Sequence, residues 1–113
     1  MNDLKELENY FTNLDFNIKF KKENNSNKEF DYCITINNEK LLVEMKNEVR
    51  PITLAYMDAL FNNQNSKMLL VANYITPSAK EKLREHHINY IDSFGNAYFN
   101  LDNLKLFVEK GNA

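Results

Sequence analysis

Hydrophobic and polar residues recur with two different periods along this chain, and each period predicts a type of element. Residues 3–14 carry apolar side chains at helical spacing, with Asn2 or Asp3 as the N-cap, so an amphipathic helix is expected there. Its apolar positions are Leu4, Leu7, Phe11 and Leu14. Residues 16–21 instead alternate strictly between apolar and polar positions, which predicts a half-buried strand. Residues 22–28 are polar and predict a loop.

The middle of the chain contains two short apolar runs, residues 32–36 and 41–45, which predict a pair of neighbouring strands. Asn37 and Asn38 lie between the runs, and asparagine tolerates the positive φ angles that a tight hairpin turn needs. We therefore expect a hairpin that brings the start of its first strand close to the end of its second.

The second half of the chain alternates predicted helices with predicted strands. Pro51 suits a first helical turn, and the helix is expected to run to about residue 63. Its predicted apolar side consists of Ile52, Ala55, Tyr56, Met57, Ala59 and Leu60. Residues 67–75 are apolar at both parities, which indicates a central strand covered on both faces. Thr76 and Pro77 start a further helix, to about residue 87, with Ala79, Leu83 and the stem of Lys82 inward.

The remaining segments complete the predicted fold. Strands are expected at residues 88–92, 97–99 and 104–108, with a turn at 93–96. The order α–β–β–β–α–β–α–β predicts an α/β fold, a mixed β-sheet flanked by helices on both sides. A length of 113 residues predicts a single domain, residues 1–113.

Composition narrows the class of protein. The chain is 43% hydrophobic and 27% charged, as is ordinary for a soluble domain. No apolar run approaches the roughly 20 residues of a membrane span, and the first residues lack a signal-peptide pattern, so no membrane partner is expected. Cys33 is the single cysteine and falls in a predicted strand, which favours a buried thiol and a reducing, cytoplasmic location.

The charge balance argues weakly against nucleic acid as a partner. The net charge is −2, whereas dedicated nucleic-acid binders are usually basic because they release counterions from phosphates. Four lysines nevertheless cluster, at positions Lys19, Lys21, Lys22 and Lys28. They are either the solvated side of a strand or a basic segment that meets a phosphate backbone.

Three side chains of the predicted hairpin form a candidate site. Asp31 precedes the first strand, and Glu44 and Lys46 stand at the end of the second. Because side chains alternate along a strand, Glu44 and Lys46 point the same way while Met45 points oppositely. Two carboxylates that converge beside an ammonium suit a hard divalent cation such as Mg²⁺, which takes oxygen ligands. The alternative is an exposed hairpin whose charges are simply solvated.

The sequence Asp31…Glu44-Met45-Lys46, with a spacing of thirteen, resembles the PD-(D/E)xK signature of the restriction-endonuclease-like superfamily. Phe30 stands where that signature has proline. The resemblance implies the restriction-endonuclease-like sheet and metal-dependent hydrolysis of DNA phosphodiester bonds, that is, a Mg²⁺- or Mn²⁺-dependent endodeoxyribonuclease. Asp31, Glu44 and the backbone carbonyl of Met45 would hold the cation. Lys46 would orient or deprotonate the attacking water, or pair with the phosphate.

The same resemblance suggests further contributors. A glutamate of the first helix joins the metal site in several branches, and by this resemblance Glu6 or Glu8 could contribute, with Glu8 preferred. The alternative is that Glu8 is an ordinary surface glutamate. The residues expected to contact DNA are Lys21, Lys22, Lys28 and Arg50, with Gln64 as an accessory residue beside the site. Many members act as symmetric dimers, so a homodimer is expected.

A second stretch, Asp92-Ser-Phe-Gly95-Asn96-Ala97 after a Leu-Arg helix, resembles small bacterial endonuclease-like proteins and a domain of AbiE-type type IV antitoxin regulators. By this resemblance Asp92 and Asn96 are accessory residues, and their alternative role is to hold a turn through their own backbone. An inert DNA- or protein-binding module in phage defence or toxin–antitoxin regulation is the alternative to an enzyme. A pure oligomerisation domain is more remote. The adjacent His86 and His87 point about 100° apart on a helix and cannot share a metal.

Overall fold

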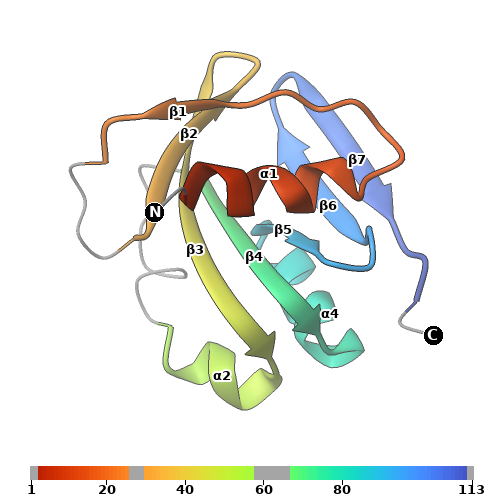
Figure 1. Ribbon diagram of the computed structural model, residues 1–113. Coiled ribbons are helices and arrows are strands. Elements are labelled where there is room, and N and C mark those ends of the chain that lie inside the picture. The colour runs from red at the N-terminus through yellow and green to blue at the C-terminus, as the bar shows by residue number, and fades with distance from the viewer. Residues whose placement is uncertain (1–2, 26–29, 58–66, 112–113) are drawn as a thin grey trace.

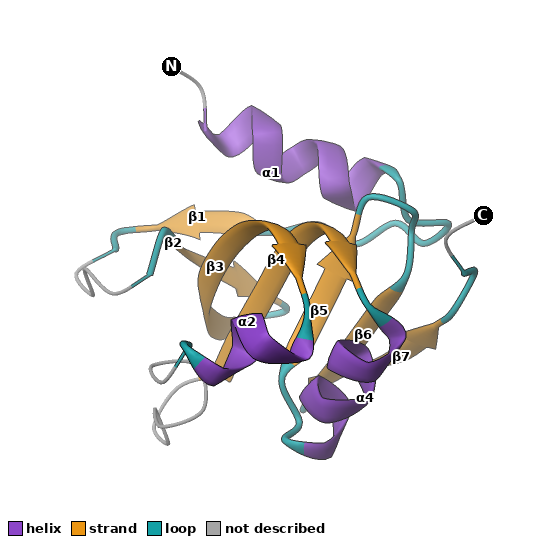
Figure 2. Ribbon diagram, turned by 90° about the horizontal axis from the view of Figure 1, so that it is seen from below, coloured by secondary structure: helices purple, strands orange, loops and turns teal. Residues whose placement is uncertain are grey.

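A computed structural model describes residues 3–25, 30–57 and 67–111 of the chain. The described residues form a seven-stranded mixed sheet with helices on both faces (Figures 1 and 2). Helix α1 (Asp3–Thr12) crosses one face, and the helices α2 (Pro51–Ala55) and α4 (Pro77–Glu85) cover the other. The predicted α/β fold with a mixed, helix-flanked sheet is therefore confirmed.

The strands follow one another across the sheet in their chain order. They are β1 (Lys21–Glu23), β2 (Tyr32–Ile36), β3 (Glu39–Val49), β4 (Lys67–Ile75), β5 (Asn89–Asp92), β6 (Ala97–Leu101) and β7 (Leu104–Val108). The pairs β1–β2–β3 are antiparallel, β3–β4–β5 are parallel, and β5–β6–β7 are antiparallel again. Because parallel strands end on the same side, the carboxyl ends of β3, β4 and β5 meet at one edge of the sheet.

The sheet separates two apolar clusters. One lies beneath α1, where Leu7 and Phe11 pack against Val43 and Val71. The other lies beneath α2 and α4 and includes Leu42, Leu54, Leu70, Ala72 and Leu83. Strand β4 contributes successive residues to opposite clusters, so its residues are buried on both sides. The prediction of a central, doubly covered strand at 67–75 is confirmed.

The β2–β3 hairpin also forms as predicted. Asn37 and Asn38 make its two-residue turn with φ angles of 52° and 69°, and Ile36 pairs with Glu39 directly across it. The second strand is longer than expected, because β3 continues to Val49 alongside β4. This extension carries the end of β3 past the start of β2, which leaves its last residues to pair with β4.

The first helix and the segment after it differ from the prediction. Helix α1 ends at Thr12, two residues early, although Leu14 is still buried. Of residues 16–21, only Lys21 belongs to a strand. Ile18 and Phe20 pack against the cluster beneath α1. The alternating pattern therefore reflects side chains packed on that cluster rather than a backbone paired into the sheet.

The helix after β3 uses a different face from the one predicted. It is described from Pro51 to Ala55, and residues 58–66, which include the predicted positions Ala59 and Leu60, lie outside the described residues. Ile52 and Tyr56 are 66% and 84% exposed, whereas Leu54 and Met57 are buried. The expectation that Ile52, Ala55 and Tyr56 face the sheet was wrong, because the short helix turns its Leu54 side inward, whereas the expectation for Met57 is confirmed.

Helix α4 begins as predicted, with the Thr76 hydroxyl accepting a hydrogen bond from the Ala79 amide and Pro77 in the first turn. Lys82 is exposed, and Lys80 rather than Lys82 enters the interior. Among the described residues, no helix has the length and apolar content needed to cross a membrane.

Candidate active site

The start of β2 and the middle of β3 bring the two predicted carboxylates together, so the expectation that Glu44 and Lys46 stand at the end of the strand was wrong. Tyr32 pairs with Val43, so Asp31 lies beside Glu44 on the neighbouring strand. The Asp31 amide donates to the Val43 carbonyl at 2.9 Å, and Asp31 Oδ2 accepts a hydrogen bond from the Met45 amide at 2.8 Å. These two bonds fix both the backbone and the carboxylate of Asp31 against β3.

Lys46 completes the group that we call the hairpin site, consisting of Asp31, Glu44 and Lys46. Its Nζ lies 3.4 Å from Glu44 Oε2, and the side chains of Lys46 and Glu44 are 39% and 20% exposed. Leu42, two residues before Glu44, belongs to the cluster beneath α2 and α4. The hairpin site therefore opens on the α2 and α4 face of the sheet.

The Glu44 carboxyl is perturbed by burial and by its charged neighbours. Burial raises the pKa of the Glu44 carboxyl, the neighbouring Asp31 carboxylate raises it further, and Lys46 opposes both effects. Two carboxylates held this close favour a proton or a metal ion between them. Among the described residues no three His, Cys, Asp or Glu side chains gather around one point. A pair of carboxylates still fits Mg²⁺, which is often bound by one or two carboxylates together with waters and phosphates.

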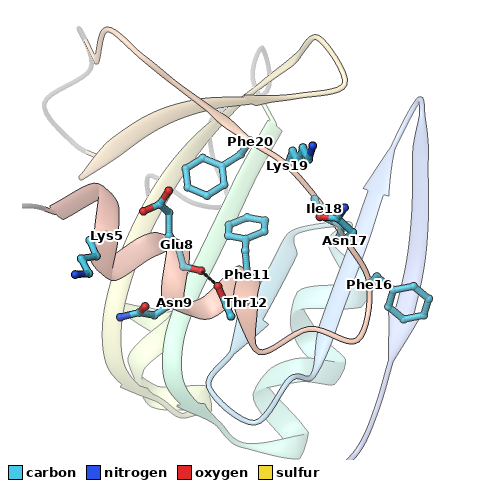
Figure 3. Close-up of a pocket in the computed structure, with 10 residues that line it drawn as sticks. All are labelled: Lys5, Glu8, Asn9, Phe11, Thr12, Phe16, Asn17, Ile18, Lys19 and Phe20. Atoms are coloured by element: carbon cyan, nitrogen blue, oxygen red, sulfur yellow. Dashed lines mark hydrogen bonds between the residues drawn. The ribbon is translucent and has the colours of Figure 1, made fainter.

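The structure does not bring Glu8 to the hairpin site. Glu8 projects from α1, which lies on the opposite face of the sheet from Glu44. It lines a cavity of about 550 Å³ between α1 and residues 16–20, together with Lys5, Phe11 and Phe20 (Figure 3). This cavity lies across the sheet from the hairpin site, so Glu8 is not placed to join that site.

The predicted DNA-contacting residues are dispersed. Lys21 and Lys22 are exposed on β1, where the Lys22 Nζ lies 5.7 Å from the centroid of the Tyr32 ring. Arg50 follows β3 on the same side of the molecule as α2, and its Nε donates to Glu48 Oε2 at 2.6 Å. Lys28 and Gln64 lie outside the described residues. Arg50 is therefore near the end of the strand that carries Glu44 and Lys46, and it is already paired with an acidic neighbour.

Asp92 and Asn96 hold a buried turn. Asp92 Oδ1 accepts hydrogen bonds from the amides of Phe94 and Asn96 at 2.9 and 3.0 Å, and Asp92 Oδ2 accepts one from the Asn96 side chain at 2.8 Å. Asn96 in turn bonds the backbone of Lys110 and Gly111. This geometry favours the alternative in which these side chains hold their own turn, and it adds an attachment for the last described residues.

Lys80 is a buried charged residue that the sequence interpretation missed. Its Nζ lies 3.3 Å from Asp92 Oδ2 and 3.3 Å from Glu109 Oε2, and the side chain is 1% exposed. One signal was present, because Lys80 follows Ala79 and precedes Leu83 by three residues, so helical spacing places it on the buried side. A lysine at such a position indicates a buried carboxylate partner.

The comparisons with known proteins identify no protein similar to this chain. The sequence matches no protein-family model, and neither a curated protein nor a solved structure shows significant similarity to it.

Proposed function

We propose that this chain is a metal-dependent nuclease that hydrolyses DNA phosphodiester bonds at the hairpin site. The observation that carries the proposal is the meeting of Asp31, Glu44 and Lys46 on one face of two adjacent strands. The bond from the Met45 amide to Asp31 and the position of Glu44 beside Asp31 support the proposal. The site residues and their spacing are those that the PD-(D/E)xK resemblance implies.

The fold is consistent with this proposal. The resemblance implies a mixed sheet with helices on both faces and the acidic residues at the ends of adjacent strands. The described residues have such a sheet, although Asp31 directly precedes β2 and Glu44 lies at the middle of β3, which continues to Val49. A restriction-endonuclease-like arrangement, DNA as the partner and a homodimer that places two sites on two strands are parts of the proposal.

Each residue of the hairpin site has a distinct role in the proposed reaction. Asp31 and Glu44 would hold Mg²⁺ or Mn²⁺, with the backbone carbonyl of Met45 as a further oxygen ligand. A bound divalent cation supplies positive charge against the phosphate and favours ionisation of the attacking water. The bond from the Met45 amide keeps the Asp31 carboxylate oriented before any cation binds.

Lys46 is placed to act on the phosphate or on the attacking water. In the described structure its ammonium pairs with Glu44, and a cation between the carboxylates would compete for that oxygen. The released ammonium would then pair with a phosphate oxygen or orient the attacking water. Cation binding at Glu44 would therefore free the Lys46 ammonium to contact the substrate.

The test is cleavage of supercoiled, linear and branched DNA with Mg²⁺ or Mn²⁺ by the wild type, Asp31→Ala and Lys46→Ala. Each variant should lose at least about a hundredfold in rate, the lower end of what a positioned acid–base group contributes. Lys40→Ala is the matched control, because Lys40 is an exposed lysine at the opposite end of β3. Circular dichroism verifies that each variant is folded. Wild-type cleavage by either site variant would refute the assignment.

A catalytically inert DNA- or protein-binding module is the second candidate. It is favoured by the ion pair that occupies Lys46 and by the net charge of −2, which gives little general attraction for DNA. A salt-dependent mobility shift of DNA without cleavage at millimolar Mg²⁺ would select this candidate over the nuclease.

A further inference from the structure

A second, smaller hollow lies on the other face of the sheet from the hairpin site. It has a volume of about 240 Å³ and is lined by Glu6, Asn9, Tyr10, Asn13, Asn73 and Ser93. Asn73 stands near the end of β4, and Ser93 directly follows β5. The hollow, which we call the amide cavity, therefore lies between α1 and the carboxyl ends of parallel strands.

The side chains of the amide cavity are held in place by their own hydrogen bonds. The Tyr10 hydroxyl donates to Asn73 Oδ1 at 2.7 Å, and Asn73 Nδ2 donates to Asn47 Oδ1 at 2.6 Å. The Ser93 hydroxyl donates to the Asn73 carbonyl at 2.7 Å, and Asn13 Nδ2 donates to the Ser93 carbonyl at 3.2 Å. Such a chain orients its donors and acceptors before a ligand arrives, which lowers the entropic cost of binding.

These bonds do not use the full hydrogen-bonding capacity of the lining side chains. A side-chain amide has two N–H donors and an oxygen with two lone pairs, and a phenolic oxygen can accept as well as donate. Asn73 uses one N–H on Asn47 and accepts one bond from Tyr10. The cavity can therefore offer donors and acceptors side by side, as is needed to recognise a polar group that has both.

Charge and size restrict the ligand. The described lining contains no lysine or arginine, and its one charged side chain is the acidic Glu6. Burial raises the pKa of the Tyr10 hydroxyl, and the nearby Glu6 raises it further. An anionic group such as a phosphate is therefore disfavoured here. The volume is below the roughly 300–1,000 Å³ of sites for drug-sized ligands, so the cavity accommodates about one ring system and the rest of a larger ligand stays outside it.

We infer that the amide cavity binds one nucleobase through its hydrogen-bonding edge. A nucleobase is planar and uncharged, and asparagine amides pair with the adjacent donor and acceptor of adenine. Glu6 accepts hydrogen bonds and so favours a base with an exocyclic amino group, which is adenine, cytosine or guanine, over uracil or thymine. The base comes either from a free nucleoside or from a nucleotide turned out of a DNA strand. Only this second source rests on the proposed nuclease function.

The experiment titrates isotope-labelled protein, without divalent metal, with adenosine, cytidine and uridine and follows backbone amide shifts by NMR. Adenosine and cytidine should shift the amides of Asn73 and Ser93 at millimolar concentration, and uridine should bind several-fold more weakly. Glu6→Gln should weaken adenosine binding about tenfold, as expected for loss of a hydrogen bond to a charged group. Glu6 is exposed, so this variant is expected to fold.

Glu8→Gln is the matched control, because Glu8 is an exposed glutamate of the same helix that lines the other cavity. It should bind adenosine as the wild type does. Absence of adenosine shifts at Asn73 and Ser93, equal binding of uridine, or an equal loss in Glu8→Gln would each overturn the inference.

A second arm identifies the source of the base. Lys46→Ala protein is titrated, again without metal, with a short single-stranded adenine-containing oligonucleotide. Shifts at the amide cavity support an extruded base, whereas shifts with adenosine alone support a free nucleoside. Both arms are independent of cleavage, so failure of the nuclease proposal and failure of the amide cavity are separately visible.

Discussion

The ion pair between the buried side chains of Lys80 and Asp92 can be tested by removing the charge on Lys80. In Lys80→Met the side chain keeps its length and loses its ammonium, so Asp92 remains in place, fully buried and without its nearest countercharge. Removing one partner of a buried ion pair typically destabilises a protein by about 3–5 kcal/mol. Asp92 still accepts bonds from the Phe94 and Asn96 amides and the Asn96 side chain, which stabilise its ionised form. We therefore expect the lower end, about 3 kcal/mol.

Urea unfolding at neutral pH, followed by circular dichroism, measures this loss. With a slope of about 1.5 kcal/mol per molar urea, the midpoint should fall by about 2 M. Lys82→Met is the control, because Lys82 is exposed on the same helix and should change stability by no more than about 0.5 kcal/mol. The double variant Lys80→Met/Asp92→Asn should recover part of the loss, since no charge is then left buried. If Lys80→Met unfolds within about 1 kcal/mol of Lys82→Met, the ammonium does not lie against Asp92.

Three further outcomes are expected. Gly95→Ala should destabilise the fold by about 1–2 kcal/mol in urea unfolding. The reason is that Gly95 has a φ of +88° and a Cβ there would lie 3.0 Å from a backbone oxygen. An unchanged unfolding midpoint would contradict this turn geometry. Leu54→Ala should cost about 2–5 kcal/mol and Ile52→Ala less than about 0.5, and the reverse order would contradict the inward face of α2. The folded protein binds the Glu44 proton more tightly than the unfolded chain, so the Glu44 contribution to stability is lost as pH rises through the raised pKa. Glu44→Gln should remove this loss in unfolding measured from about pH 4 to 7, and in the wild type an NMR titration should show Mg²⁺ lowering the pKa of Glu44.

Local patterns predicted the features that depend on neighbours in the chain. In residues 67–75, both the odd-numbered and the even-numbered positions are largely apolar, which is enough to indicate a strand covered on both faces. The Asn37-Asn38 turn determined the register of the hairpin. That register is also what brings Asp31 beside Glu44. The central part of the fold and the pairing within the hairpin site could thus be predicted from short stretches.

The features that the sequence did not predict depend on which face a segment turns to the rest of the molecule. Helical spacing predicts the side of the helix on which Glu8 lies, but it does not predict which face of the sheet the helix covers. Helix α1 covers the face opposite the one on which α2 and α4 lie, and Glu44 is on the α2 and α4 face. The five residues of α2 are too few to define an apolar stripe, so Ile52 and Leu54 could not be ranked. Lys80 was missed because its burial depends on Asp92, twelve residues further along the chain.

The sequential arrangement of the strands has a consequence for folding kinetics. Each pair of sheet neighbours is also consecutive in the chain, so the described sheet can grow outward by adding adjacent segments, without threading a strand between two others. The tight β2–β3 and β6–β7 hairpins close over the shortest loops, whereas joining β3 to β4 requires a longer crossover. Low contact order accelerates folding, so the two ribbons should acquire hydrogen-exchange protection before the parallel centre that unites them.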